Sequence, residues 1–229
     1  MRGIDIIAAF ELEINKLGDA LSKPDTDDSL YWINQGVIKF VKNRFNGDPV
    51  KRTSYEQNEK RTRDLILLLK EYKPQTPDVN TQYHDYNYYE YTYPKDMMFV
   101  LNEDVTISDI SGNNVIDTCA FECTADNFMY RINNSLTDFH YKHHRARPLR
   151  VRTKTGFRLL TDKKYQINSY TLGYIKVPTE VTNEDPFAEY KDFEDYTWLE
   201  IVKIAAQMYI ENQSDPRYKT ITNEVLTQE

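Results

Sequence analysis

The apolar positions near the N-terminus follow a helical period. Between residues 4 and 17 they recur every three or four positions, and Gly18 follows as a stop signal. This predicted stripe consists of Ile4, Ile7, Ala8, Glu11, Ile14 and Leu17, and it is apolar except for the acid. A second helix is predicted after the acidic capping residues at 23–28, with Asn46-Gly47 as its end. Its apolar stripe consists of Leu30, Ile33, Val37, Phe40, Val41 and Phe45.

Two more segments carry the same period. Residues 55–72 predict a third helix, charged in its first half and apolar in its second, which Pro74 and Pro77 close. Residues 193–212 predict a C-terminal helix, with a stripe that includes Trp198, Val202 and Tyr209. Residues 215–229 are polar and too poor in apolar surface to fold alone. The residues expected in the helical core are Leu30, Ile33, Val37, Leu65, Leu68, Trp198, Ile201 and Ala205.

The middle of the chain has a different pattern. Residues 80–93 are rich in tyrosine without a helical period, which predicts a loop or irregular strand, and residues 97–101 form a short apolar run typical of a strand. Residues 105–181 contain short bursts of Thr, Val, Ile and Tyr between turn residues, the pattern of antiparallel hairpins. We therefore predict an α+β fold, a helical bundle formed by the N- and C-terminal helices with an inserted antiparallel β region. The predicted parts are 1–94, 95–182 and 183–229.

Composition narrows the class of protein. The chain has 229 residues, 40% of them hydrophobic, and 18 are tyrosines, which suit either interfaces or half-buried strands. Two cysteines exclude a disulfide framework and favour a reducing compartment. The N-terminal residues do not resemble a signal peptide, and no apolar run approaches the ~20 residues that span a bilayer. We expect a soluble protein made in the cytoplasm, without a membrane partner.

The charges are unevenly distributed along the chain. The net charge of −7 argues against a protein whose whole surface binds nucleic acid. However, residues 140–158 contain seven bases and no acid, whereas residues 180–200 contain eight acids and one base. Such blocks can dock against copies of the same chain, or they can be two solvated faces. The predicted interface residues in the basic block are Tyr141, Arg145, Arg147, Arg150, Arg152 and Lys154. They could contact acidic surface on a neighbouring subunit, or phosphates with Tyr141 stacking on a base.

Catalytic and metal-binding patterns are weak. Cys119 and Cys123 with His140, His143 and His144 could supply zinc ligands, but a Cys-x3-Cys spacing on a strand separates the thiols by ~13 Å. We interpret them as small strand residues and surface histidines. The sequence lacks the Gly-x-Ser-x-Gly and His-Glu-x-x-His motifs, and it has only seven glycines. We therefore predict no enzyme activity and no catalytic, cofactor or metal-binding residues.

Four segments together resemble a known family. They are the helix that begins Asp27-Asp-Ser-Leu-Tyr-Trp-Ile-Asn, the helix opening Tyr55-Glu-Gln-Asn-Glu-Lys-Arg, the junction Leu172-Gly-Tyr-Ile-Lys-Val-Pro, and the closing Ala205-Ala-Gln-Met-Tyr-Ile-Glu-Asn. Together they resemble the ring or adaptor proteins of the head-to-tail connector in short-tailed bacteriophages, most closely those of crAss-like phages. The resemblance covers about half of the chain.

The resemblance implies a structural role in the virion. Such proteins form a ring, typically of twelve copies, beneath the portal protein, and they connect it to further ring and tail proteins. DNA passes through the channel without specific binding. Known adaptors of short-tailed phages are mainly helical, so the large β portion here is a departure. Two alternatives are a nucleic-acid-binding module that uses the basic hairpin at 140–158, and a tail or receptor-binding component of the virion. For the ring, we expect charge reversal at Arg147 and Arg150 to weaken assembly.

Overall fold

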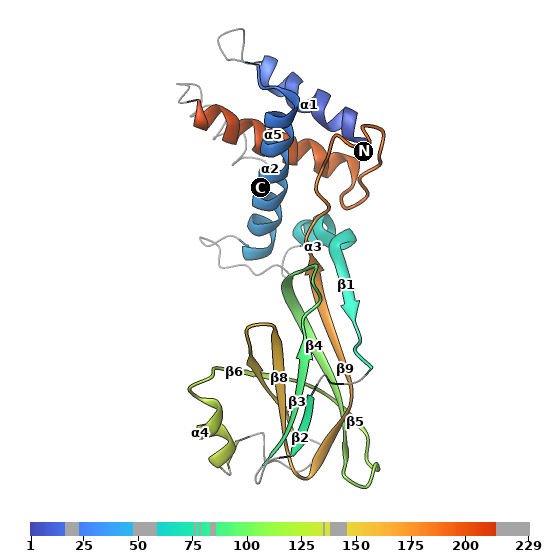
Figure 1. Cartoon of the computed structure of the whole chain (residues 1–229), viewed down its shortest axis with the longest axis vertical. Coiled ribbons are helices and arrows are strands. Elements are labelled where there is room, and N and C mark those ends of the chain that lie inside the picture. The colour runs from blue at the N-terminus through green and yellow to red at the C-terminus, as the bar shows by residue number, and fades with distance from the viewer. Residues whose placement is uncertain are drawn as a thin grey trace. The chain divides into compact units, whose positions relative to one another are not determined.

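The computed structural model describes residues 1–16, 23–47, 59–75, 77, 79–82, 86–134, 136–137 and 146–213. The chain forms two compact units, one from residues 1–68 and 178–229 and the other from residues 69–177 (Figure 1). The first is the helical unit and the second is the β unit.

The helical unit is organised around its C-terminal helix. Helix α5 (Asp195–Asn212) packs against α1 (Gly3–Asn15) and α2 (Thr26–Asn46), and α2 also contacts α3 (Glu59–Leu65), which continues into the 3-10 turn η2 (Ile66–Leu68). The eight residues predicted for the helical core are all buried, which confirms that prediction. They are Leu30, Ile33, Val37, Leu65, Leu68, Trp198, Ile201 and Ala205.

Helix α2 begins and ends where its sequence signals predict. The Asp25 carboxylate accepts a hydrogen bond from the Asp28 backbone N–H at 2.8 Å, which caps the helix. Gly47 ends it with a φ of 75°, a conformation that favours glycine. In the middle of the helix, Gly36 lies against Ala205 of α5, so closely that an added Cβ would be 2.8 Å from the Ala205 Cβ. Glycine at this position therefore sets how near the two helices approach.

The buried face of α1 differs from the predicted one. Its buried apolar residues are Ile6, Phe10 and Ile14, whereas Ile4 and Ala8 of the predicted stripe are exposed. Both stripes have helical spacing, and the sequence alone does not say which of them meets α5. Phe10 decides the outcome because its ring packs edge-on against Tyr209 of α5 at 6.2 Å. Leu17 and Gly18 lie outside the described residues.

The β unit consists of two sheets. The first sheet is antiparallel, and its strand order is β1 (Leu69–Tyr72), β9 (Tyr165–Lys176), β4 (Met97–Asp109) and β5 (Ile116–Cys119). The second has the order β2 (Val79–Gln82), β3 (Tyr86–Thr92), β8 (Gly156–Asp162), β7 (Leu149–Arg152) and β6 (Phe121–Cys123), with β6 and β7 parallel. Helix α4 (Phe128–Asn133) packs on the second sheet through Ile132, which lies in one cluster with Leu149 and Leu160.

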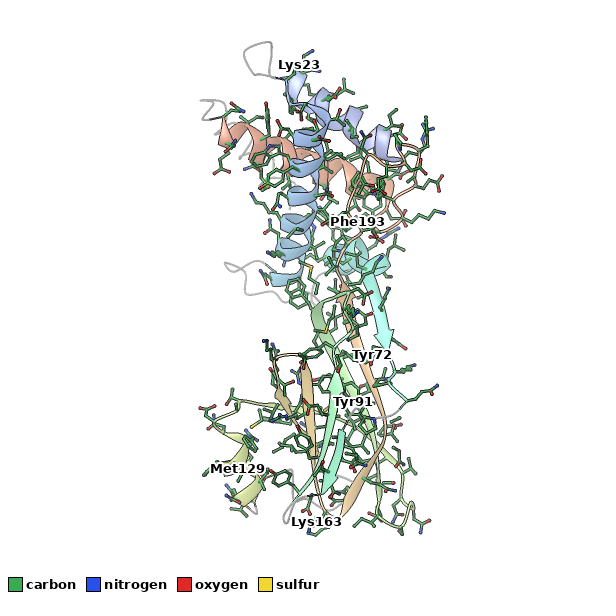
Figure 2. All side chains as sticks on the ribbon, viewed as in Figure 1. Lys23, Tyr72, Tyr91, Met129, Lys163 and Phe193 are labelled. Carbon is green, nitrogen blue, oxygen red and sulfur yellow. The ribbon has the colours of Figure 1, made fainter. Side chains whose placement is uncertain are left out.

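Aromatic side chains fill the core between the two sheets. Tyr91 of β3 stacks at 5.4 Å on Phe157 of β8 and on Tyr170 of β9, so the second sheet contacts the first through these rings. Figure 2 shows Tyr91 among the side chains of the β unit. Tyr89, Tyr165 and Tyr174 belong to the same buried cluster. Many of the tyrosines therefore lie in the core, on half-buried strands. This is one of the two interpretations that composition left open.

The predicted fold class is wrong. A helical bundle of N- and C-terminal helices with an inserted antiparallel β region does not describe the chain, because the described residues contain nine strands in two sheets and five α-helices. Two of those helices, α3 and α4, have seven and six residues. Strand β1 lies where the pattern predicts the end of a helix, and β2 and β3 lie within residues 79–92, where it predicts a loop or irregular strand. The second sheet is mixed rather than antiparallel.

Strand pairing explains both segments. The apolar run at residues 65–69 fits a helix or a strand, and β1 forms because residues 69–72 pair with residues 172–175 of β9. Strand β3 alternates strictly, with Asn87, Tyr89 and Tyr91 buried between half-buried neighbours. A two-residue period is typical of a strand. It is hard to recognise in this sequence because the inward positions of β3 hold tyrosine and asparagine instead of aliphatic residues.

Candidate interaction surfaces

Arg150 is the buried centre of a charge cluster in the β unit that reaches the surface at Glu122 and Arg152. Its side chain is only 3% exposed, and its Nε lies 2.8 Å from Oε2 of Glu103 on β4. Its Nη2 lies 2.8 Å from Oε2 of Glu122 on β6, and Glu122 also pairs with Arg152 at 2.8 Å. The guanidinium therefore links the two sheets, and its charge is neutralised within the chain.

The carboxylate partner of Arg150 is itself desolvated. The Tyr170 hydroxyl donates a hydrogen bond to Oε1 of Glu103 at 2.5 Å. Burial raises the pKa of Glu103 above its usual value, although the Tyr170 hydroxyl and Arg150 oppose the shift. Burial, with the nearby Glu103 carboxylate, also raises the pKa of Tyr170. These three groups stabilise the contact between the sheets, and a charge change at any of them disturbs the fold as well as the surface.

The exposed bases lie at one end of the β7–β8 hairpin. Arg152, Lys154 and Arg158, which we call the basic hairpin end, are all exposed. Arg158 faces Val151 across the strand pair, so its side chain lies on the opposite face of the sheet from Arg152, with Lys154 in the turn between them. The turn is ordered, because the Thr153 N–H donates to the Gly156 carbonyl at 2.9 Å.

The structure divides the predicted interface residues into separate groups. Arg147, Arg152 and Lys154 are exposed, Arg150 is buried, and Tyr141 and Arg145 lie outside the described residues. Contact of this segment with a neighbouring subunit or layer stays a prediction. The prediction can be tested on the exposed residues of the segment. Substitution of the buried Arg150 would first destabilise the β unit.

The acidic block also separates into structural and exposed groups. Asp192 is buried and accepts a hydrogen bond from the Thr179 N–H at 2.6 Å, and Asp195 lies 2.8 Å from the Met1 amino group. Glu200 pairs with Arg44 of α2 at 2.5 Å, and Arg44 also pairs with the buried Asp64 of α3 at 2.9 Å. The remaining exposed acids are concentrated at residues 180–189, which we call the acidic loop and which contain Glu180, Glu184, Asp185 and Glu189.

An exposed aromatic residue lies in the acidic loop. Phe187 is 65% exposed, although its backbone is fixed by a hydrogen bond from its N–H to the Asp185 carboxylate at 3.1 Å. The adjoining Pro186 carbonyl accepts from the Ile4 N–H at 2.8 Å, and Ile4 is 42% exposed. Phe187 is not among the candidate interface residues identified from the sequence. The sequence does show it as a single aromatic residue within a run of acids.

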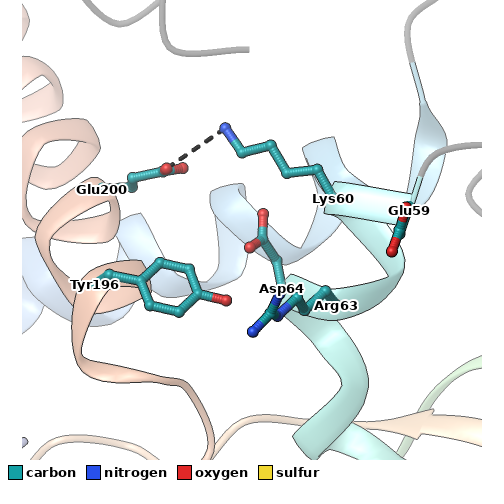
Figure 3. Close-up of a pocket in the computed structure, with 6 residues that line it drawn as sticks. All are labelled: Glu59, Lys60, Arg63, Asp64, Tyr196 and Glu200. Atoms are coloured by element: carbon teal, nitrogen blue, oxygen red, sulfur yellow. Dashed lines mark ion pairs between the residues drawn. The ribbon is translucent and has the colours of Figure 1, made fainter.

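A charged hollow lies between α3 and α5 in the helical unit. Figure 3 shows Tyr196 and Glu200 of α5 facing Lys60, Arg63 and Asp64 of α3. The hollow measures about 520 Å³, and Lys60 Nζ lies 3.5 Å from Glu200 Oε1. Burial raises the pKa of Asp64, with the Glu200 carboxylate adding to the shift and the Arg44 guanidinium opposing it. Positive and negative side chains line the hollow together, so their charges partly compensate each other.

Neither cysteine belongs to a metal-binding group among the residues that the structure describes. Cys119 is exposed on β5 and Cys123 is buried on β6, and the three histidines proposed with them lie outside the described residues. Among the described residues no group of three or more His, Cys, Asp or Glu side chains is arranged to hold a metal ion. In the same part of the chain, no helix has the length and apolar character needed to cross a membrane.

The described surfaces carry exposed charges of both signs and an exposed aromatic residue. Comparison with protein families matches residues 29–185 to the phage tail ring protein 3/4 family, and that match covers more than half of the chain and residues of both units. The chain therefore belongs to this family of crAss-like phage tail ring proteins. No curated protein matches it.

Family membership confirms the resemblance seen in the sequence. It gives the chain a structural role as a ring component of the phage tail. It also implies self-association, contact with other tail components and a location in the virion.

Proposed function

We propose that the chain forms a ring in the portal–tail connector of the virion, where it acts as a non-enzymatic structural component. Its copies, twelve in the proposed ring, dock on one another and on the portal protein or adjoining connector and tail proteins. DNA passes through the channel without specific binding. The family match over residues 29–185 carries this proposal, because it extends across both units of the chain.

The charge distribution supports ring formation by self-association. The chain carries an exposed basic hairpin end in the β unit and an exposed acidic loop in the helical unit. Two different surfaces of opposite charge allow head-to-tail contact between copies, and such contacts close into rings when the rotation between neighbours permits. Complementary potentials also suppress wrong orientations.

Native mass spectrometry of the purified chain, alone and mixed with the portal protein of the same genome, tests the proposal. Complexes with a ring-sized copy number, formed alone or only with the portal protein, support a connector ring. A chain that stays monomeric and does not bind the portal protein contradicts direct docking and favours a more distal position in the tail.

A further inference from the structure

We propose that the acidic loop of one copy, with Phe187 at its centre, receives the basic hairpin end of the neighbouring copy. This inference rests on the proposed ring and specifies which surfaces of the subunits meet. The charge blocks in the sequence do not show which side chains are available to a partner. The structure adds this information, because it shows which charges form ion pairs within the chain and which do not.

The acidic loop is preorganised for binding. The Asn34 side chain of α2 holds residue 181 on both sides, donating to the Val181 carbonyl at 3.0 Å and accepting from its N–H at 2.9 Å. The Tyr190 hydroxyl accepts from the Thr182 N–H at 2.9 Å, and the N-terminal residues form a β-bridge between Arg2 and Glu189. A loop fixed in this way loses little conformational entropy on binding.

Phe187 supplies an apolar anchor within the negative surface. It is 65% exposed, and residues 180–189 contain four acids and no base. Aromatic side chains are enriched at the centres of interfaces, and polar residues form the rim around them. A guanidinium can also bind the face of a phenyl ring. The surface therefore fits a partner that is cationic and that carries arginine.

The basic hairpin end has the complementary chemistry. The turn carries Lys154, and Arg152 and Arg158 lie on opposite faces of the flanking strands, where Arg152 pairs with Glu122 and Arg158 lies 3.9 Å from Glu90. Residues 152–158 contain no acid. Within the described part of the chain, neither Lys154 nor Glu184 forms an ion pair, so both charges remain available for an intermolecular contact. A second copy of the chain carries this partner surface in any homomeric ring.

The test uses two variants that leave the structural contacts intact. Variant A, Lys154→Glu with Thr155→Glu, makes the hairpin end more negative, and variant B, Asn183→Lys with Glu184→Lys, makes the loop more positive; all four positions are exposed. Self-association is measured by sedimentation velocity at low ionic strength, for the wild-type chain, each variant and an equimolar mixture of A and B. Where the wild type assembles only with the portal protein, the same series is measured in its presence.

The expected result is loss in the separate variants and recovery in the mixture. At the contact between residues 154–155 and residues 183–184, each variant alone sets like charges opposite each other, which should weaken association by at least about tenfold. In the mixture, the altered hairpin end of A can bind the altered loop of B, and the unchanged hairpin end of B can bind the unchanged loop of A. Association should therefore return. Phe187→Ala should weaken association at unchanged charge.

Matched controls separate this contact from general charge effects. Lys163→Glu changes the charge by the same amount as Lys154→Glu, but at the turn beyond the opposite end of β8, and Lys163 is also exposed (Figure 2). Glu11→Lys on the exposed side of α1 is the control for the loop. Both controls should associate as the wild type does.

Each other outcome has a distinct meaning. If the wild type and both variants associate equally well, the proposed contact between the acidic loop and the basic hairpin end is wrong. The proposed ring is then unaffected. If the mixture fails to recover while the four substitutions combined in one chain restore association, the pairing lies within the chain and the inference is overturned. If the wild type associates neither alone nor with the portal protein, the proposed function fails as well.

Discussion

Arg150 shows how much one buried side chain contributes to the β unit. Replacing it by Met keeps an apolar stem but leaves Glu103 buried without its cation. Removing one partner of a buried ion pair costs about 3–5 kcal/mol. We expect Arg150→Met to lower the free energy of unfolding by this amount in urea denaturation, with faster hydrogen exchange in β4 and β7.

Arg152→Met is the matched control for Arg150→Met. Arg152 pairs with the same Glu122 at 2.8 Å, but its side chain is 63% exposed. Exposed ion pairs contribute about 0–1 kcal/mol, so this variant should unfold nearly as the wild type does. Equal losses in the two variants would contradict the central role of Arg150.

Tyr174 should titrate at unusually high pH. Burial, with the hydrogen bond to Asp96 at 2.9 Å, raises the pKa of Tyr174 to about 12, from 10.0. Because the folded-state pKa is raised, the neutral phenol stabilises the folded chain fully below pH 10, and this contribution disappears as pH rises from 10 to 12. An NMR titration of ¹³Cζ-labelled tyrosine, with Tyr174→Phe for assignment, measures it.

In addition to burial, the Asp96 carboxylate raises the pKa of Tyr174. Asp96→Asn removes the hydrogen-bonded negative charge beside Tyr174 and should move its titration midpoint downwards. A Tyr174 midpoint near 10.0 in the unmodified chain is inconsistent with the buried phenol.

At the scale of elements, the close approach of α2 to α5 at Gly36 gives a test of helix packing. Gly36→Ala places a methyl group 2.8 Å from the Ala205 Cβ, and overpacking costs about 1–3 kcal/mol. The gain in helix propensity, about 1 kcal/mol, offsets only part of this. We expect net destabilisation, reported by fluorescence of Trp32 and Trp198, both of which lie in the helical unit.

Two further variants separate packing from propensity. Asn43→Ala changes an exposed position of α2, so it should leave the helical unit stable. Adding Ala205→Gly to Gly36→Ala reopens the space between the helices and should recover part of the loss. If Gly36→Ala is more stable than the wild type, the two helices are not in tight contact there.

The elements that the sequence predicted best are those whose local signals and burial agree. Helix α2 has an acidic cap, an apolar stripe and a terminal glycine; the cap and the glycine match the structure, and so do the stripe residues other than Phe45, which is only half-buried. Residues 69–72 could not be assigned correctly from sequence, because their strand forms only through pairing with residues about a hundred positions away. Likewise, charge alone could not distinguish Arg150 from Arg152, since their difference in burial depends on how the two sheets pack.

At the scale of the whole molecule, the charge distribution predicts little affinity for free DNA. The net charge is −7, and Arg150, at the centre of the basic block, is neutralised by Glu103 and Glu122. We expect no measurable binding to a short DNA duplex in fluorescence anisotropy at physiological ionic strength. Tight binding that weakens steeply with added salt would support the nucleic-acid-binding alternative instead.

The helical unit is built from two separate stretches of the chain, and this constrains how the protein is made. Helices α1 and α2 emerge from the ribosome early, yet their apolar faces are covered by α5, which follows residues 69–177. At ~5–20 residues per second, the synthesis from the end of α2 to the end of α5 takes roughly 8 to 33 s. During translation the β unit can fold first, while the early helices wait for their partner. A prematurely terminated chain therefore lacks a complete helical unit, and we expect such a chain to be excluded from the ring.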